Sequence, residues 1–192
     1  MRRLVIGFVG FVIAFVTSYG AKAEEAAAKI TPIQISIWNP VQLAPEDRDV
    51  WGFRLNLLYG KNRDVFGLDL GLVNSSRSFQ GIQVGFANTG LGMSLPPFSL
   101  SYVYFTSSGI QIGSLNYFSG DFDGIQVAGI VNTAHRVRGI QISCFGNKAD
   151  DMNGLQIGVF NHAKTMTGVQ IGLINTITDS PVSFLPIVNA HF

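Results

Sequence analysis

The sequence has a single cysteine, Cys144, so no disulfide can form within the chain. Secreted domains that depend on disulfides carry an even set of cysteines, and stability here must therefore come from burial and hydrogen bonding. Cys144 lies in the apolar run of residues 140–145. This position predicts a small, buried side chain and not a reactive thiol.

Charge is also scarce, because Asp, Glu, Lys and Arg make up only 13% of the chain. Residues 1–23 hold three basic residues and no acid, so residues 24–192 hold 10 basic against 12 acidic residues. No cluster of lysine or arginine is present beyond residue 23. The sequence therefore predicts no nucleic-acid partner, since such binding requires a basic patch.

The residue patterns of catalytic and metal sites are missing as well. His135 and His162 fall at or near the same position of the repeat described below, about 10 Å apart if repeats stack at ~4.8 Å, which is too far to share a metal. The acidic pairs are Asp121 with Asp123 and Asp150 with Asp151. They lack the Gly/Asp nonapeptide of calcium-binding β-rolls. We therefore assign no catalytic, cofactor-binding or metal-binding residue, and expect a protein that is not an enzyme and has no cofactor.

The N-terminus has the three parts of a secretory signal peptide. Arg2 and Arg3 precede an apolar stretch at residues 4–16, and Ala21-Lys22-Ala23 gives the small-x-small cleavage pattern. Thirteen apolar residues are too few to span a bilayer, which needs about 20. We expect residues 1–23 to be a signal peptide, residues 24–31 a lead-in segment, and residues 32–192 one β-repeat domain.

What the chain does have is an internal repeat of the form Gly, aliphatic, Gln, aliphatic, Gly, two variable residues, Asn. The lead glycines stand at positions 67, 81, 109, 124, 139, 154 and 168, at spacings of 14, 28, 15, 15, 15 and 14 residues. The spacing of 28 predicts a degenerate unit at residues 96–105. Atypical units at 32–39, 52–59 and 182–189 bring the array to about eleven. The position two residues before the lead glycine is apolar in most units, namely at Val50, Val65, Phe79, Phe122, Val137, Met152 and Met166.

The alternation within each unit predicts a strand, and the chain as a whole is predicted to be all-β. The fold that we favour is a β-solenoid with one coil per 14–15 residues, in which isoleucines stack inside and glutamine stacks on glutamine. The alternative is an antiparallel up-and-down β-barrel with one strand per unit. The solenoid is favoured because successive units repeat at every period and are joined by links of similar length.

The repeated glutamines are the one feature that could carry a function, and they are Gln83, Gln111, Gln126, Gln141, Gln156 and Gln170. The simpler interpretation is a stack of hydrogen-bonded amides. The alternative is a flat surface that binds a polysaccharide or a host ligand.

The repeats, the opening residues 34–40, the segment at 51–60 and the ending at 185–190 together resemble a family of bacterial surface-repeat proteins first noticed in spirochaetes. The resemblance covers nearly the whole of the chain after residue 23. It implies an exported protein at the cell surface, in the outer membrane or in the periplasm, and it brings no known activity. We therefore expect a structural, adhesive or ligand-binding role towards an unidentified envelope partner. The second expectation is an outer-membrane barrel with a pore or transport role.

Overall fold

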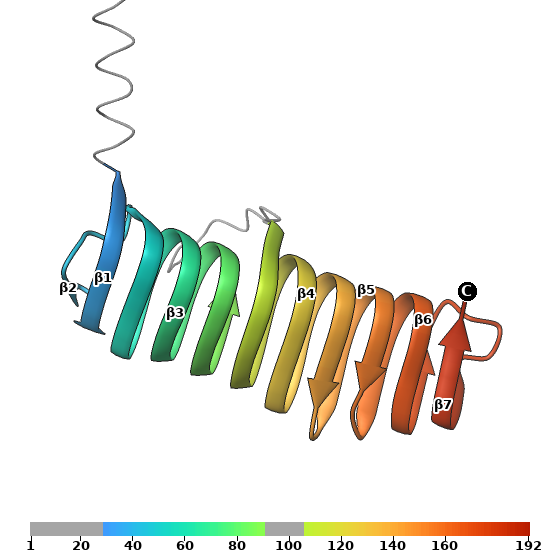
Figure 1. Ribbon diagram of the computed structural model, residues 1–192. Coiled ribbons are helices and arrows are strands. Elements are labelled where there is room, and N and C mark those ends of the chain that lie inside the picture. The colour runs from blue at the N-terminus through green and yellow to red at the C-terminus, as the bar shows by residue number, and fades with distance from the viewer. Residues whose placement is uncertain (1–28, 91–105) are drawn as a thin grey trace, which may run out of the picture.

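The computed structural model describes residues 29–90 and 106–192, which form an elongated stack of β-coils (Figure 1). All strands belong to one sheet in the order β2-β1-β3-β4-β5-β6-β7. The strands are β1 (Ile30–Trp38), β2 (Val41–Gln42), β3 (Asp49–Gly90), β4 (Thr106–Ser143), β5 (Gly146–Ile157), β6 (Phe160–Ile177) and β7 (Phe184–His191). The predicted signal peptide and residues 24–28 of the lead-in lie outside the described residues.

Each coil pairs in parallel with the next, and like residues face like residues. Between β5 and β6, Gly154 pairs with Gly168, Gln156 with Gln170, and Asn147 with Asn161. The prediction of a solenoid with one coil per repeat is therefore confirmed. The sheet is open and its coils are parallel, so the antiparallel barrel alternative is wrong.

The lead glycines allow this close stacking. Gly154 has a φ of 136°, and a Cβ built there would lie 2.0 Å from the carbonyl oxygen of Gly139 in the preceding coil. Such a contact is far inside van der Waals distance, and a positive φ strains any residue with a side chain. Glycine is thus required at this corner by both the backbone conformation and the neighbouring coil.

The coil interior differs from the predicted one. The repeated glutamines and asparagines are buried, whereas the isoleucines beside them face outward, with Ile82 45% exposed and Ile112 42% exposed. The predicted stack of isoleucines inside is therefore wrong. The apolar interior comes instead from the residues that precede each lead glycine and from the link segments, such as Val137, Ala149 and Met152. A second, smaller cluster contains Val50, Val65 and Phe79.

The unit predicted at residues 96–105 was expected to form a coil between those that begin at Gly81 and Gly109. These residues are outside the described part of the chain. However, Gly81 pairs directly with Gly109, and Gln83 with Gln111, in one continuous parallel register. No coil lies between these two strands, so the spacing of 28 residues contains one coil and an additional segment.

The two ends of the stack are also atypical. After β1, the chain turns back to form β2, which pairs antiparallel with β1. At the other end, β7 pairs antiparallel with β6, and Gln170 faces Asn189. The unit predicted at 182–189 is therefore not a further coil of the same direction but a reversed strand that covers the last coil.

The neighbouring units at residues 124–132 and 139–147 each contain one extra residue and share an irregularity. Ala128 and Ser143 are buried in place of the second glycine of the repeat. The backbone N–H of Cys144 donates to the carbonyl oxygen of Ala128 at 3.3 Å, so the bulge passes from one coil to the next. Cys144 itself is exposed, and the prediction of a buried cysteine is wrong. The extra residue turns its side chain outward.

Candidate functional site

The glutamines form a continuous ladder inside the solenoid. Gln111 donates its Nε2 to the Oε1 of Gln83 at 2.8 Å, and the same bond recurs between each later pair up to Gln170 and Gln156. These side chains are 0–1% exposed. The interpretation as an amide stack is confirmed. The alternative of a glutamine surface that binds ligands is wrong, because a ligand cannot reach the ladder.

The asparagines form a second ladder that points the other way along the axis. Asn74 donates to the Oδ1 of Asn88, and each asparagine donates to the one in the following coil. The glutamines, by contrast, donate to the preceding coil. Most of these asparagines also donate to a backbone carbonyl near the corner, as Asn147 does to Ile157 at 2.8 Å. Each buried amide thus gains partners, which removes most of the penalty for burying a polar group.

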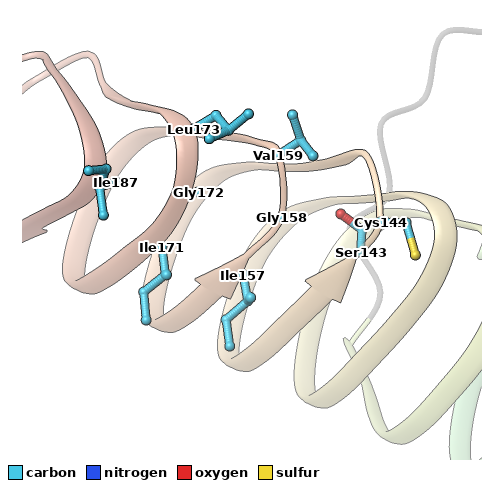
Figure 2. A pocket seen from close by; sticks show the side chains of 9 residues that line it. All are labelled: Ser143, Cys144, Ile157, Gly158, Val159, Ile171, Gly172, Leu173 and Ile187. Atoms are coloured by element: carbon cyan, nitrogen blue, oxygen red, sulfur yellow. The ribbon is translucent and has the colours of Figure 1, made fainter.

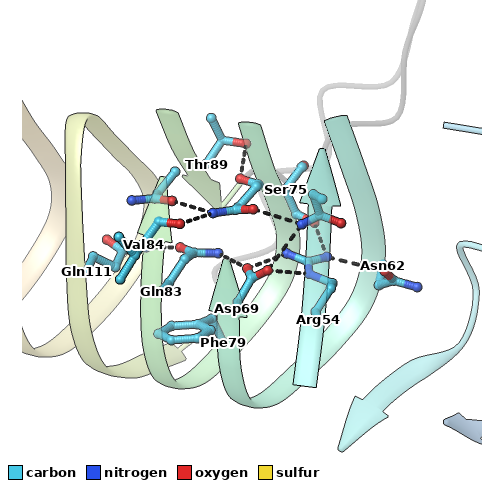
Figure 3. Close-up of polar contacts among 12 residues, drawn as sticks. Arg54, Asn62, Asp69, Ser75, Phe79, Gln83, Val84, Thr89 and Gln111 are labelled. Carbon is cyan, nitrogen blue, oxygen red and sulfur yellow. Dashed lines mark hydrogen bonds and ion pairs between the residues drawn. The ribbon is translucent and has the colours of Figure 1, made fainter. Parts of the chain in front are cut away.

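Both ladders meet a buried ion pair near the N-terminal end (Figure 3). Asp69 stands at the glutamine position of its coil and accepts from Arg54 Nε at 2.7 Å, Arg54 Nη2 at 2.6 Å and Gln83 Nε2 at 2.7 Å. Asn56 adds a fourth donor at 3.1 Å. Both charged side chains are 0% exposed. The carboxylate is therefore fully satisfied, as a buried charge must be.

The outward side chains of the repeat form an extensive apolar face. The name apolar face is used below for the exposed apolar residues of the repeat segments that begin at each lead glycine or its equivalent position. Each of these residues is 37–67% exposed. They are Ile33, Ile35, Ile37, Trp38, Leu57, Leu58, Leu68, Leu72, Ile82, Phe86, Ile112, Ile130, Ile142, Phe145, Phe160, Ile171, Leu173 and Ile174. The only charged residues in the described segments that form this face are Arg54 and Asp69, and both are buried in the interior.

The apolar face extends along the whole stack. Its strands belong to coils that begin at positions 32, 52, 67, 81, 109, 124, 139, 154 and 168. At a strand spacing of ~4.8 Å and a rise of ~3.3 Å per residue, the face measures roughly 40 by 17 Å, or about 700 Å². Monomeric soluble proteins rarely expose a contiguous apolar patch larger than a few hundred Å², and larger patches mark interaction sites.

A groove of about 420 Å³ runs through the C-terminal part of this face. Figure 2 shows Ile157 and Ile171 on one side of the glycines of the two coils, and Val159 and Leu173 on the other. Ile187 of β7, Ser143 and Cys144 complete its lining. The groove lies between two aliphatic rows beside Gly158 and Gly172, whose Cβ positions lie next to buried asparagine side chains.

The charged residues lie on the link segments, away from the apolar face. Arg136 bonds to Asp121 in the preceding coil and to Asp151 in the following coil, both at 3.1 Å. Arg138 forms a two-point pair with Asp123. Three of the four paired acidic residues are thus engaged by arginines, and Oδ2 of the fourth, Asp150, lies 2.7 Å from Nδ1 of His135. Exposed pairs of this kind contribute little to stability.

The two histidines do not share a repeat position. His162 is in register with Lys148, which is in register with Thr133, whereas His135 lies beside Asp150. Both rings are half-buried. His162 Nδ1 lies 3.0 Å from the hydroxyl of Thr176. Within the described ranges, no group of three or more His, Cys, Asp or Glu side chains could hold a metal ion.

Two carboxyl groups near the N-terminal links have shifted pKa values. Burial raises the pKa of Asp64, and the nearby charge of Asp49 adds to this effect. The hydrogen bond from Lys61 lowers the pKa of Glu46, whose carboxylate lies 2.8 Å from the lysine Nζ. The two shifts have opposite signs, so protonation of these groups affects stability in opposite directions.

Sequence reasoning missed the apolar face and the buried ion pair. The signal for the ion pair was present, since Arg54 and Asp69 both occupy the glutamine position of the repeat. The signal for the face was that no unit has a charged residue at the two positions that flank the glutamine position. Residues 29–90 and 106–192 contain no helix of the length and hydropathy needed to cross a bilayer.

Comparisons of the chain with models of protein families, with curated proteins and with solved structures gave no match.

Proposed function

We propose that this chain is an exported, non-enzymatic repeat protein of the cell envelope, and that it acts by attaching through its apolar face. The observation that carries the proposal is the uninterrupted apolar face on one side of the coils, with the charged side chains on the links. Exposed apolar area on this scale favours burial against another surface. The signal-peptide pattern of residues 1–23 and the resemblance to surface-repeat proteins support the envelope as the place where this surface lies.

The architecture suits a structural or adhesive role. The backbone bonds between coils and the two amide ladders connect every coil to its neighbours, which makes the stack a rigid support for an extended surface. The second expectation, a pore through the outer membrane, depended on a closed barrel. The open sheet gives it no support.

Export and processing can be tested directly. The chain is expressed with its N-terminus intact in a Gram-negative host, the cells are fractionated, and the N-terminus of the recovered protein is determined by mass spectrometry. We expect a product that begins at Glu24 in the envelope fraction. The matched variant, Ile13→Arg, interrupts the apolar stretch and should leave the full-length chain in the cytosol. Recovery of the unaltered chain from the cytosol, with residues 1–23 intact, would contradict the proposal.

A further inference from the structure

We infer that the apolar face lies flat on a lipid bilayer, with the solenoid axis parallel to the membrane plane. This inference rests on the proposed function and names its partner. The first support is the separation of charge on the coil surface. In the described segments of the apolar face no charged side chain reaches solvent, whereas the links carry paired charges such as Arg138 with Asp123. Only one side of the coil is therefore compatible with hydrocarbon, which favours lying on the membrane over crossing it.

The second support is the state of the backbone. A surface that enters the apolar region of a bilayer must have its backbone N–H and C=O groups bonded internally. In this solenoid the parallel register pairs each coil with its neighbours on both sides, as Ile140 pairs with Leu155 and Leu155 with Val169. The apolar face consequently presents aliphatic side chains over a backbone that is already satisfied.

The third support distinguishes a bilayer from a protein partner or a second copy. The area of about 700 Å² is close to the ~800 Å² per partner of an ordinary protein interface, so area alone does not decide. Protein interfaces also contain about one hydrogen bond per 100–200 Å², which sets their register. Hydroxyl and amide side chains are scarce on the described apolar face: they are Ser114, Ser143 in the groove and Tyr59 at one margin. A fluid lipid surface needs no such groups.

The fourth support is the position of the aromatic side chains. Trp38 and Tyr59 lie together at one margin of the face, with ring centroids 5.9 Å apart, and Trp51 with Phe66 lies before the lead glycine at the other margin, 5.1 Å apart. Trp38 and Trp51 are 58% and 55% exposed. Tryptophan and tyrosine favour the boundary between hydrocarbon and headgroups, so these pairs are placed where a bilayer surface would meet the sides of the coil.

The test uses the exported, processed protein and vesicles of phosphatidylcholine, with a parallel set that contains phosphatidylglycerol. We expect the protein to float with both kinds of vesicle, and equally at 0.1 M and 1 M salt (about a twofold difference at most), because apolar burial drives the binding. Failure to float, or floating only with the anionic vesicles at low salt, would overturn the inference. Light scattering that shows a dimer with an inaccessible apolar face would overturn it as well.

The variant for this test is Phe86→Asp with Leu173→Asp, which places two charges on exposed positions of the apolar face. The matched control is Thr106→Asp with Thr178→Asp, which places the same charges on exposed positions of the links, outside the face. We expect the first variant to lose vesicle binding by about a hundredfold, since each charge in an apolar contact region costs at least a factor of about ten in affinity. The control should change binding by less than about twofold.

A measurement on the unmodified protein guards against misfolding of the variants. Trp38 and Trp51 are the two tryptophans of the chain. Their fluorescence should shift to the blue with vesicles and be quenched by brominated lipid, and an unchanged spectrum would overturn the inference. A protein that is exported but does not bind vesicles would remove this inference and leave the proposed function standing. A protein that stays in the cytosol would remove the proposed function, whatever its affinity for lipid.

Discussion

Gln83 donates its Nε2 to the carboxylate of Asp69 at 2.7 Å, and this bond sets the direction of the whole glutamine ladder. An ionised carboxylate only accepts hydrogen bonds, so Gln83 must present its NH2 group to Asp69. Its Oε1 is then left to accept from Gln111. Each later glutamine must therefore adopt the same amide orientation. One charged residue thus orients the buried amides from residue 83 to residue 170.

Removal of Asp69 should be strongly destabilising. Asp69→Ala leaves the guanidinium of Arg54 buried without its counter-charge, and we expect a loss of about 3–5 kcal/mol in the free energy of unfolding. The measurement is urea unfolding followed by tryptophan fluorescence. The double variant Arg54→Gln with Asp69→Gln restores the residue that most other coils carry, and it should recover most of the loss. Equal destabilisation of the single and double variants would contradict this account of the ion pair.

A break in the middle of the ladder should also be destabilising. Gln141→Leu leaves the Oε1 of Gln126 and the Nε2 of Gln156 without their ladder partners in a buried site. Each unsatisfied group costs about 1–3 kcal/mol, so a total loss of about 2–5 kcal/mol is expected. The control is Gln80→Leu at an exposed position, which should change stability by less than about 0.5 kcal/mol. Similar losses in both variants would mean that the amide ladder contributes nothing specific.

Gly139 and Gly129, which lie in neighbouring coils, should lose different amounts of stability when each is replaced by alanine. Gly139 has a φ of 140°, and a Cβ there would lie 2.0 Å from the carbonyl oxygen of Gly124. We expect Gly139→Ala to lose on the order of 1–3 kcal/mol from backbone strain, with a further loss from the clash. Gly129 has no contact closer than 3.7 Å at its Cβ position, so Gly129→Ala should be nearly neutral. Thermal unfolding of both variants checks this, and equal effects would contradict the stacking argument.

Stability should depend on pH through Asp64 in a defined direction. Because burial raises its pKa above the ordinary value of 3.8, Asp64 favours the folded state only when protonated. That contribution is present below the unfolded pKa and is lost as the pH rises through the folded pKa. Asp64→Asn should therefore be more stable than the parent at pH 7, and the difference should shrink towards pH 3.

Glu46 provides a control of opposite sign. The hydrogen bond from Lys61 lowers its pKa below 4.5, so its contribution is present above the unfolded pKa and is lost as the pH falls through the folded pKa. Glu46→Gln should be slightly less stable than the parent at pH 7, with no difference at the lowest pH. Unfolding curves between pH 3 and pH 7 test both variants together. A pH-independent difference in either case would contradict the assigned cause.

The single cysteine should react without unfolding. Cys144 is exposed at the groove of the apolar face, so a maleimide should label the native protein to completion. The labelling rate should be within about tenfold of that in urea, since exposure and not unfolding limits the reaction. Labelling that requires urea would show that the thiol is buried, as the sequence pattern alone had suggested.

Much of the fold follows from the repeat itself. The spacing of the lead glycines, from Gly67 to Gly168, predicts the coil length, and the alternation around Gln141 or Gln156 predicts a strand in each unit. Stacking of glutamine on glutamine and of asparagine on asparagine also follows, because identical units in register bring identical residues together. The direct pairing of Gly81 with Gly109 did not follow, since a spacing of two periods is compatible with either an extra coil or an inserted segment.

The sequence by itself determined the period, the strands and the residues that face one another between coils. Only the tertiary structure decided which side of each strand is inside. Alternation with period 2 separates glutamine from isoleucine but does not say which of them is buried. The usual preference for aliphatic cores fails here because a stack of amides satisfies its own hydrogen bonds along the axis, so the narrow coil can enclose Gln141 and Asn147 and leave Ile142 outside. The apolar face results from this arrangement, in which the amides are buried and the aliphatic side chains are exposed.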